Sequence, residues 1–235
     1  DLDENRPTVP HSSDDQVPTC TMDLNDQWAY SVGDANTTSY LSGDQHIVDG
    51  FLKDLETRRP ELCKNAKYVE FAVDSAATIM LGVLWLAAFL VLSTISKVVV
   101  RGFKGAGLSK ATIVGTLSFH AIATHDERPE DVDGAYEFKV HLMPNLNSNL
   151  FSINAPIWED RLRLSLMRPD EGTSMICRFD VGDNLILALP IRYSMVSRHW
   201  YIRGFVAIDP AEAMAASHEY AKYYETHGGV SAAQS

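Results

Sequence analysis

The stretch from Ser75 to Ser96 contains no charged residue and no proline, and no other feature constrains the fold as strongly. As a helix rising about 1.5 Å per residue, it would span about 33 Å, enough to cross a hydrocarbon core of about 30 Å. Apolar residues would occupy every face of that helix, which is not typical of a surface helix. The sequence therefore predicts a transmembrane helix over residues 75–97, and a wholly buried core helix is the alternative.

Charge is unevenly distributed along the chain. The formal net charge is −11, so no nucleic-acid partner is expected, because nucleic-acid-binding surfaces are basic. Residues 97–125 differ from the rest because they contain bases and no acid. We expect residues 98–111 to form a basic hinge beside the membrane, where bases contact anionic lipid head groups. The bases concerned are Lys97, Arg101, Lys104 and Lys110.

Residues 1–45 are acidic and rich in turn-forming residues. This composition is typical of an extended arm, because it buries too little apolar surface to offset the entropy lost on ordering. Three aromatic residues are the exceptions, and we expect them to anchor the arm on a basic surface of neighbouring subunits. These residues are Trp28, Tyr30 and Tyr40.

The helical spacing of apolar residues predicts short amphipathic helices over residues 46–74, and these helices would lead to the membrane. Pro60 suits the first turn of the second helix, which is expected to continue through Tyr68 and Phe71 into the span. Cys63 lies in this part of the chain. It is the only possible disulfide partner for Cys20 on the same side of the span, and two unrelated reduced thiols are the alternative.

The N-terminal side is expected to lie outside or in a lumen, with the C-terminal side inside. Lys and Arg flank the span in equal numbers, so the positive-inside rule does not decide the orientation. The cysteine pair and a glycosylation sequon at Asn36 favour an N-terminus outside.

From residue 112 onward the pattern becomes that of short strands. Apolar residues alternate with polar ones in several segments, for example Tyr136–Leu142, and turn-forming clusters separate them. A helix is expected next, with Asp209 as its N-cap, Glu212 in a capping box and Gly228 at its end. The predicted class is an α+β membrane protein. Its C-terminal domain, residues 112–235, would be mainly β, sandwich- or barrel-like, with one C-terminal helix.

No recognised catalytic or metal-binding spacing occurs, so neither an enzyme nor a cofactor is expected. Cys177 lies within an alternating strand and is expected to be free and packed in the core. The alternative is a membrane-tethered enzyme or metal-binding domain that uses histidines of the β-rich region. These are His120, His125, His141, His199, His218 and His227.

The layout of span, basic hinge and β-rich domain is similar to that of several viral membrane proteins and of accessory subunits of organellar complexes. No motif selects between them. The sequence therefore predicts a non-catalytic, membrane-anchored structural subunit of a larger assembly, either a virion membrane or shell protein or a subunit of a cellular membrane complex. Its expected partners are a lipid bilayer and other protein subunits.

Overall fold

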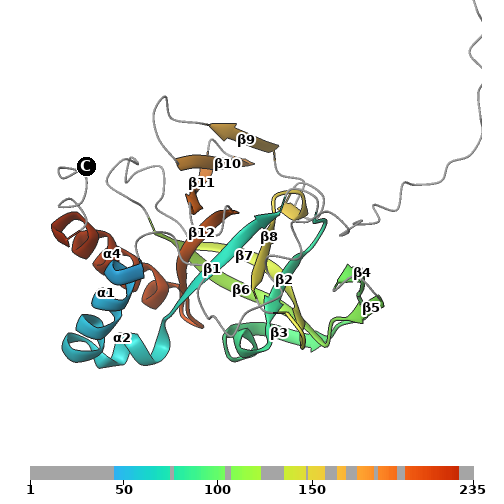
Figure 1. Ribbon diagram of the computed structural model, residues 1–235, viewed down its shortest axis with the longest axis horizontal. Helices are drawn as coiled ribbons and strands as arrows, with labels where there is room; N and C mark the ends of the chain where they lie inside the picture. Colours follow the sequence, from blue (N-terminus) through green and yellow to red (C-terminus); the bar gives the residue numbers. More distant parts are fainter. Residues whose placement is uncertain are drawn as a thin grey trace, which may run out of the picture.

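The computed structural model shows a group of helices packed beside a curved β-sheet (Figure 1). The helices are α1 (Gln45–Arg58), α2 (Pro60–Asn65) and α4 (Pro210–His227). The structure describes residues 45–74, 77–103, 107–122, 135–146, 148–156, 163–167, 174–182, 185–194 and 199–227.

Ten strands form one sheet in the order β3-β6-β7-β2-β8-β1-β12-β11-β10-β9. An additional pairing of β6 with β12 closes six of them, from β6 through β7, β2, β8 and β1 to β12, into a ring. Two further strands form a separate hairpin. The bounds are β1 (Lys67–Asp74), β2 (Met80–Val83), β3 (Leu90–Ile95), β4 (Val99–Phe103), β5 (Gly107–Lys110), β6 (Ile113–Ala121), β7 (Ala135–Met143), β8 (Asn149–Ser152), β9 (Arg163–Met167), β10 (Ser174–Gly182), β11 (Leu185–Ser194) and β12 (His199–Val206).

The ring closes where β12 meets β6, and a glycine makes this approach possible. Gly204 pairs with Ala121, next to the pair formed by Phe205 and His120. A Cβ atom at Gly204 would collide with the backbone carbonyl of His120 and with the ring of Phe119. The closure therefore needs the one residue that lacks a side chain.

Aromatic side chains fill the interior of the ring. Phe71 of β1 lies edge-to-face against Phe119 of β6 and Phe138 of β7, with ring centroids 5.6 and 5.5 Å apart. Tyr136 of β7 stacks on Phe179 of β10 at 5.9 Å, which extends this core toward the strands outside the ring. Alternate residues of β7 supply these rings, as its period-two pattern predicts.

A second core joins the helices to the outside of the ring. Phe51 of α1 is fully buried and lies 5.1 Å from the ring of Tyr220 in α4 and 6.0 Å from Phe205 in β12. Asp209 caps α4 as expected, since its Oδ1 accepts a hydrogen bond of 2.9 Å from the backbone N–H of Ala211. Glu212 accepts a hydrogen bond of 2.7 Å from Asn65, so its side chain ties α4 to α2.

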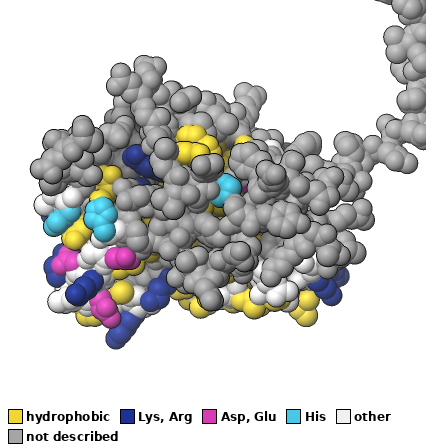
Figure 2. Space-filling model, viewed as in Figure 1, with side chains coloured by type: hydrophobic (Ala, Val, Ile, Leu, Met, Phe, Trp, Pro, Cys, Tyr) yellow, Lys and Arg dark blue, Asp and Glu magenta, His cyan; other side chains and the backbone are white. Residues whose placement is uncertain are grey.

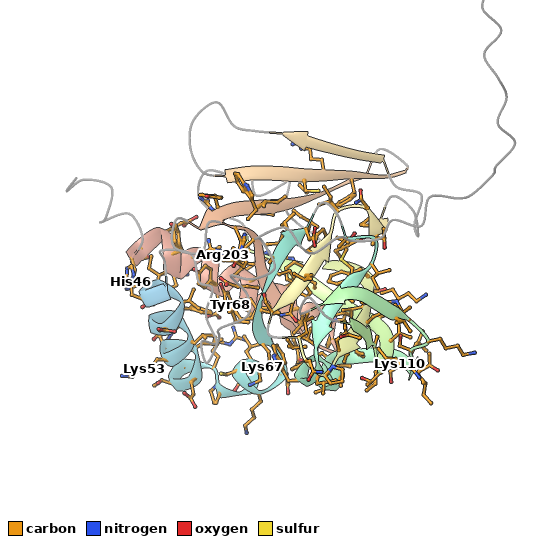
Figure 3. All side chains as sticks on the ribbon, turned by 45° about the vertical axis from the view of Figure 1, so that its right-hand side comes forward. His46, Lys53, Lys67, Tyr68, Lys110 and Arg203 are labelled. Atoms are coloured by element: carbon orange, nitrogen blue, oxygen red, sulfur yellow. The ribbon has the colours of Figure 1, made fainter. Side chains whose placement is uncertain are left out.

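A partly buried polar group lies between the helices and the ring, where Figure 3 shows Tyr68 and Arg203. The Tyr68 hydroxyl donates a hydrogen bond of 2.7 Å to Glu70, and Glu70 lies opposite Arg203 in the register of β1 and β12; Arg203 is 3% exposed. Burial, together with the Glu70 carboxylate, raises the pKa of Tyr68 well above its usual value. The hydroxyl therefore stays protonated and can serve as a donor that positions Glu70.

The transmembrane helix expected over residues 75–97 is wrong. These residues contain β2, the 3-10 helix η2 (Leu84–Phe89) and β3 instead. β2 lies inside the sheet between β7 and β8, so an uncharged segment there has apolar neighbours on both sides. Among the described residues, no helix is long and apolar enough to cross a membrane. The membrane-protein class is therefore corrected to a closed ring of strands covered by a helical layer.

One smaller expectation also fails. The chain does not continue as a helix through Tyr68 and Phe71, because Lys67–Asp74 forms β1 in the centre of the sheet. The residues expected to form a basic hinge, 98–111, include the hairpin of β4 and β5, and their place beside a membrane stays a prediction. The strands expected after residue 112 and the helix that follows Asp209 are present as β6, β7, β9 to β12 and α4.

Candidate functional site

Six exposed apolar side chains from η2, β3 and β4 form the main candidate for a functional site. Leu92 is 90% exposed and Ile95 is 78% exposed. Four others are between 37% and 50% exposed: Leu84, Trp85, Val91 and Val99. We call these six residues the apolar surface. Single exposed apolar side chains are common, whereas their concentration in one short segment, here residues 84–99, is typical of an interaction site.

η2 and β3 divide their apolar residues between the core and the solvent. Leu86 and Phe89 of η2 are buried, whereas Leu84 and Trp85 point outward. The ring of Trp85 lies edge-to-face on Phe89, with centroids 5.9 Å apart, so one side of the indole is supported by the core. The tryptophan is therefore held in place while much of its ring remains accessible.

Leu92 adopts a backbone conformation that leucine disfavours. Its φ is 51°, and the pairing of β3 with β6 is interrupted between Val91 and Thr94. A left-handed conformation costs a residue with a Cβ atom about 1–2 kcal/mol. The side chain is 90% exposed, so packing within the chain does not explain leucine there. Strain of this kind is characteristic of functional positions.

Lysines flank the apolar surface. Lys97 is exposed between β3 and β4, and Lys110 is exposed at the end of β5, where it pairs with Val99. Lys139 is exposed on β7 and lies in the same row as Val91, because Thr116 of β6 pairs with both. Glu137, also exposed on β7, is the acid closest to Lys139 along that strand. Figure 2 shows hydrophobic side chains along the lower margin, with Lys or Arg at its right-hand end.

A buried hydrogen bond fixes the end of β3. Ser96 Oγ lies 3.0 Å from His141 Nδ1 and accepts a hydrogen bond of 3.2 Å from the backbone N–H of Val98. The Ser96 hydroxyl hydrogen is thus available to His141, which then accepts it as a neutral ring. Burial, with a smaller effect from Lys139, lowers the pKa of His141 and favours that neutral form. This contact positions the start of β4 beside the apolar surface.

The histidines of the β-rich region lie in separate places. His120 lies against His218 with ring centroids 5.6 Å apart, whereas His141 contacts Ser96 and His227 stacks on Tyr223. His199 lies near Tyr201, and burial lowers its pKa. His125 is outside the described residues. Within the described ranges, no group of three or more His, Cys, Asp or Glu side chains could hold a metal ion.

The remaining candidate residues are placed only in part. Cys63 is half-buried and bonded to no described cysteine, and its pairing with Cys20 stays a prediction because Cys20 lies outside the described residues. Cys177 is buried, and burial raises its pKa to about 12. Arg101 lies on β4, and its side chain is outside the described part of the structure. Lys104, the sequon at Asn36 and the three arm aromatics, Trp28, Tyr30 and Tyr40, also lie outside the described residues.

No known protein family, no curated protein and no solved structure matches this chain. Its function is therefore inferred from the apolar surface itself. Sequence reasoning assigned Trp85, Leu92 and Ile95 to a span and missed that they form an exposed surface. The β-branched residues Val91, Thr94 and Ile95 were the available signal for a strand.

Proposed function

We propose that this chain is a non-catalytic subunit that attaches to an anionic bilayer surface through the apolar surface and its flanking lysines. The observation that carries the proposal is the combination of exposed apolar side chains and bases in an otherwise acidic chain. Residues 75–125 contain no acid, whereas the whole chain has a net charge of −11. Attachment of this kind lies on the membrane and needs no spanning helix.

The types of residue fit an interface with lipid. Tryptophan is enriched at the level of the lipid head groups, because its ring is apolar and its N–H is polar. Leu92 and Ile95, the two most exposed members, are aliphatic and would enter the acyl boundary. Each lysine beside an anionic membrane contributes about 1 kcal/mol. Apolar burial and charge together supply the two signals that stable attachment requires.

A vesicle-sedimentation assay on the full-length protein tests this proposal. We expect binding to vesicles of phosphatidylcholine with 30% phosphatidylserine, and weaker binding to phosphatidylcholine alone. Substituting Lys97→Glu and Lys110→Glu together removes two favourable contacts of about 1 kcal/mol each, so affinity should fall at least about 30-fold. Raising the salt concentration should weaken binding of the wild type, because exposed charges are screened.

Lys53→Glu is the matched control. Lys53 is exposed on α1, and Figure 3 places it on the opposite side of the molecule from Lys110. The control changes the net charge in the same direction and should leave binding close to that of the wild type. Equal losses in the control and the double variant would show that total charge, and not this surface, governs binding. Absence of sedimentation with both vesicle types would refute the proposal.

A further inference from the structure

One edge of β3 is open in the described part of the chain. β3 lies at one end of the strand order, so one of its edges pairs with β6 and the other pairs with no described strand. Natural edge strands usually carry charged residues or proline, which discourage pairing with another segment. β3 has neither, since its sequence is Leu-Val-Leu-Ser-Thr-Ile, and its irregularity is the interruption of the pairing with β6 between Val91 and Thr94. An edge of this kind can accept an extended peptide as an additional strand.

We propose that residues 27–32 of the N-terminal arm add as a strand to the open edge of β3 in their own chain. Trp28, Tyr30 and Val32 alternate with Ala29 and Ser31 in this segment. In an extended strand, the three larger side chains would therefore lie on one face. Two of them are aromatic, the type that supplies most of the binding energy at interfaces.

Charge complementarity supports this occupant. Residues 7–44 of the arm contain acids and no Lys or Arg, and Asp23 and Asp26 lie just before the pairing segment. The apolar surface belongs to residues 75–125, which contain bases and no acid. Attraction between the two would orient the arm toward Lys97 and Lys110. The basic partner surface expected for the arm is then present in the same chain.

The length of the arm allows this contact. Residues 33–44 connect the pairing segment to the start of α1 and span about 40 Å when extended. A compact domain of the described size has a diameter of about 40 Å. Figure 1 shows α1 at the left of the ring and β3 at its lower edge, and a segment that spans the diameter of the domain can reach from one to the other. Tyr40 is too close to α1 to do so, because the residues between them span only about 17 Å. Tethering also gives the arm a millimolar effective concentration, which favours its own surface over that of another chain.

This contact goes beyond bilayer attachment and does not depend on it.

Hydrogen exchange of the full-length protein, followed by mass spectrometry, tests the inference in the absence of lipid. The test variant carries Trp28→Ser and Tyr30→Ser, and Tyr40→Ser is the control within the same arm. We expect the backbone amides of β3 to exchange at least tenfold faster in the test variant than in the wild type. They should be unchanged in the control, and the amides of β7 should be unchanged in both variants.

Equal β3 exchange in the wild type and the test variant would overturn the inference. So would an equal acceleration in the Tyr40→Ser control, or an acceleration that extends equally to β7. Sedimentation of the wild type with anionic vesicles reports separately on attachment. Faster β3 exchange in the test variant of a protein that does not sediment would refute attachment and support the arm contact. Sedimentation without any change at β3 would do the reverse.

Discussion

The substitution Leu92→Asn is expected to weaken membrane binding while making the fold more stable. Asparagine is more readily accommodated than leucine at the positive φ of 51° found at this position. The change also removes the most exposed apolar side chain of the apolar surface. The two effects act in opposite directions, which separates a functional role of Leu92 from a structural one.

The magnitudes follow from exposure and backbone strain. Complete burial of a leucine is worth about 2 kcal/mol, and Leu92 is 90% exposed, so nearly all of this is available to a bilayer. Its loss corresponds to about a 30-fold lower affinity for vesicles containing phosphatidylserine. Relief of the left-handed strain should raise the free energy of unfolding by about 1 kcal/mol. For a protein of this size, that moves the melting temperature up by about 2–4 °C.

Vesicle sedimentation and thermal denaturation followed by circular dichroism measure the two effects on the same preparations. Ile208→Asn is the control, because Ile208 is 62% exposed but precedes α4, outside the apolar surface. The control should bind vesicles as well as the wild type does. Undiminished binding by Leu92→Asn, or an equal loss in the control, would refute the assignment of this surface. A fall in the melting temperature of Leu92→Asn would refute the argument from strain.

Three further predictions concern the fold. Gly204→Ala should lower the free energy of unfolding by about 3 kcal/mol, because its methyl group collides with the backbone of β6 where the ring closes; urea unfolding that matches the wild type would contradict this. His141→Gln should reduce the loss of stability on acidification. Burial lowers the pKa of His141 in the folded state, so the neutral ring contributes stability above the unfolded-state pKa of about 6.5. The protein loses this stability as the pH falls toward the folded-state pKa. The free energy of unfolding of the wild type and of His141→Gln, measured at pH 7.5 and pH 5, tests this. His199, whose pKa is also lowered, is present in both proteins. An equal pH dependence would therefore show that His141 contributes nothing. Cys177, in a Cys20→Ser and Cys63→Ser background, should react with iodoacetamide at pH 8 only after denaturation, because it is buried and its pKa is raised to about 12; rapid alkylation of the folded protein would contradict its placement in the core.

Local patterns in the sequence were sufficient for much of the C-terminal half. The alternation from Tyr136 to Leu142 predicts β7, because a strand with one buried face shows its period directly in the sequence. Asp209 and Pro210 predict the start of α4, because a helix cap depends on residues within one turn. These features involve contacts between near neighbours, so the sequence alone determines them.

Contacts between distant strands determined the structure of residues 75–96. An uncharged apolar run shows that a segment avoids water, but not whether lipid or other strands surround it. Here Met80 pairs with Val140 in β7 and Leu90 pairs with Leu117 in β6. These partners lie far along the chain, and no local pattern identifies them. The candidate site was hidden for the same reason, because Leu92 lies where the pairing of β3 with the distant strand β6 is interrupted. The sequence by itself determined which residues are apolar and where elements with local signals, such as β7 and α4, begin, whereas only the packing of distant strands decided which apolar residues remain on the surface.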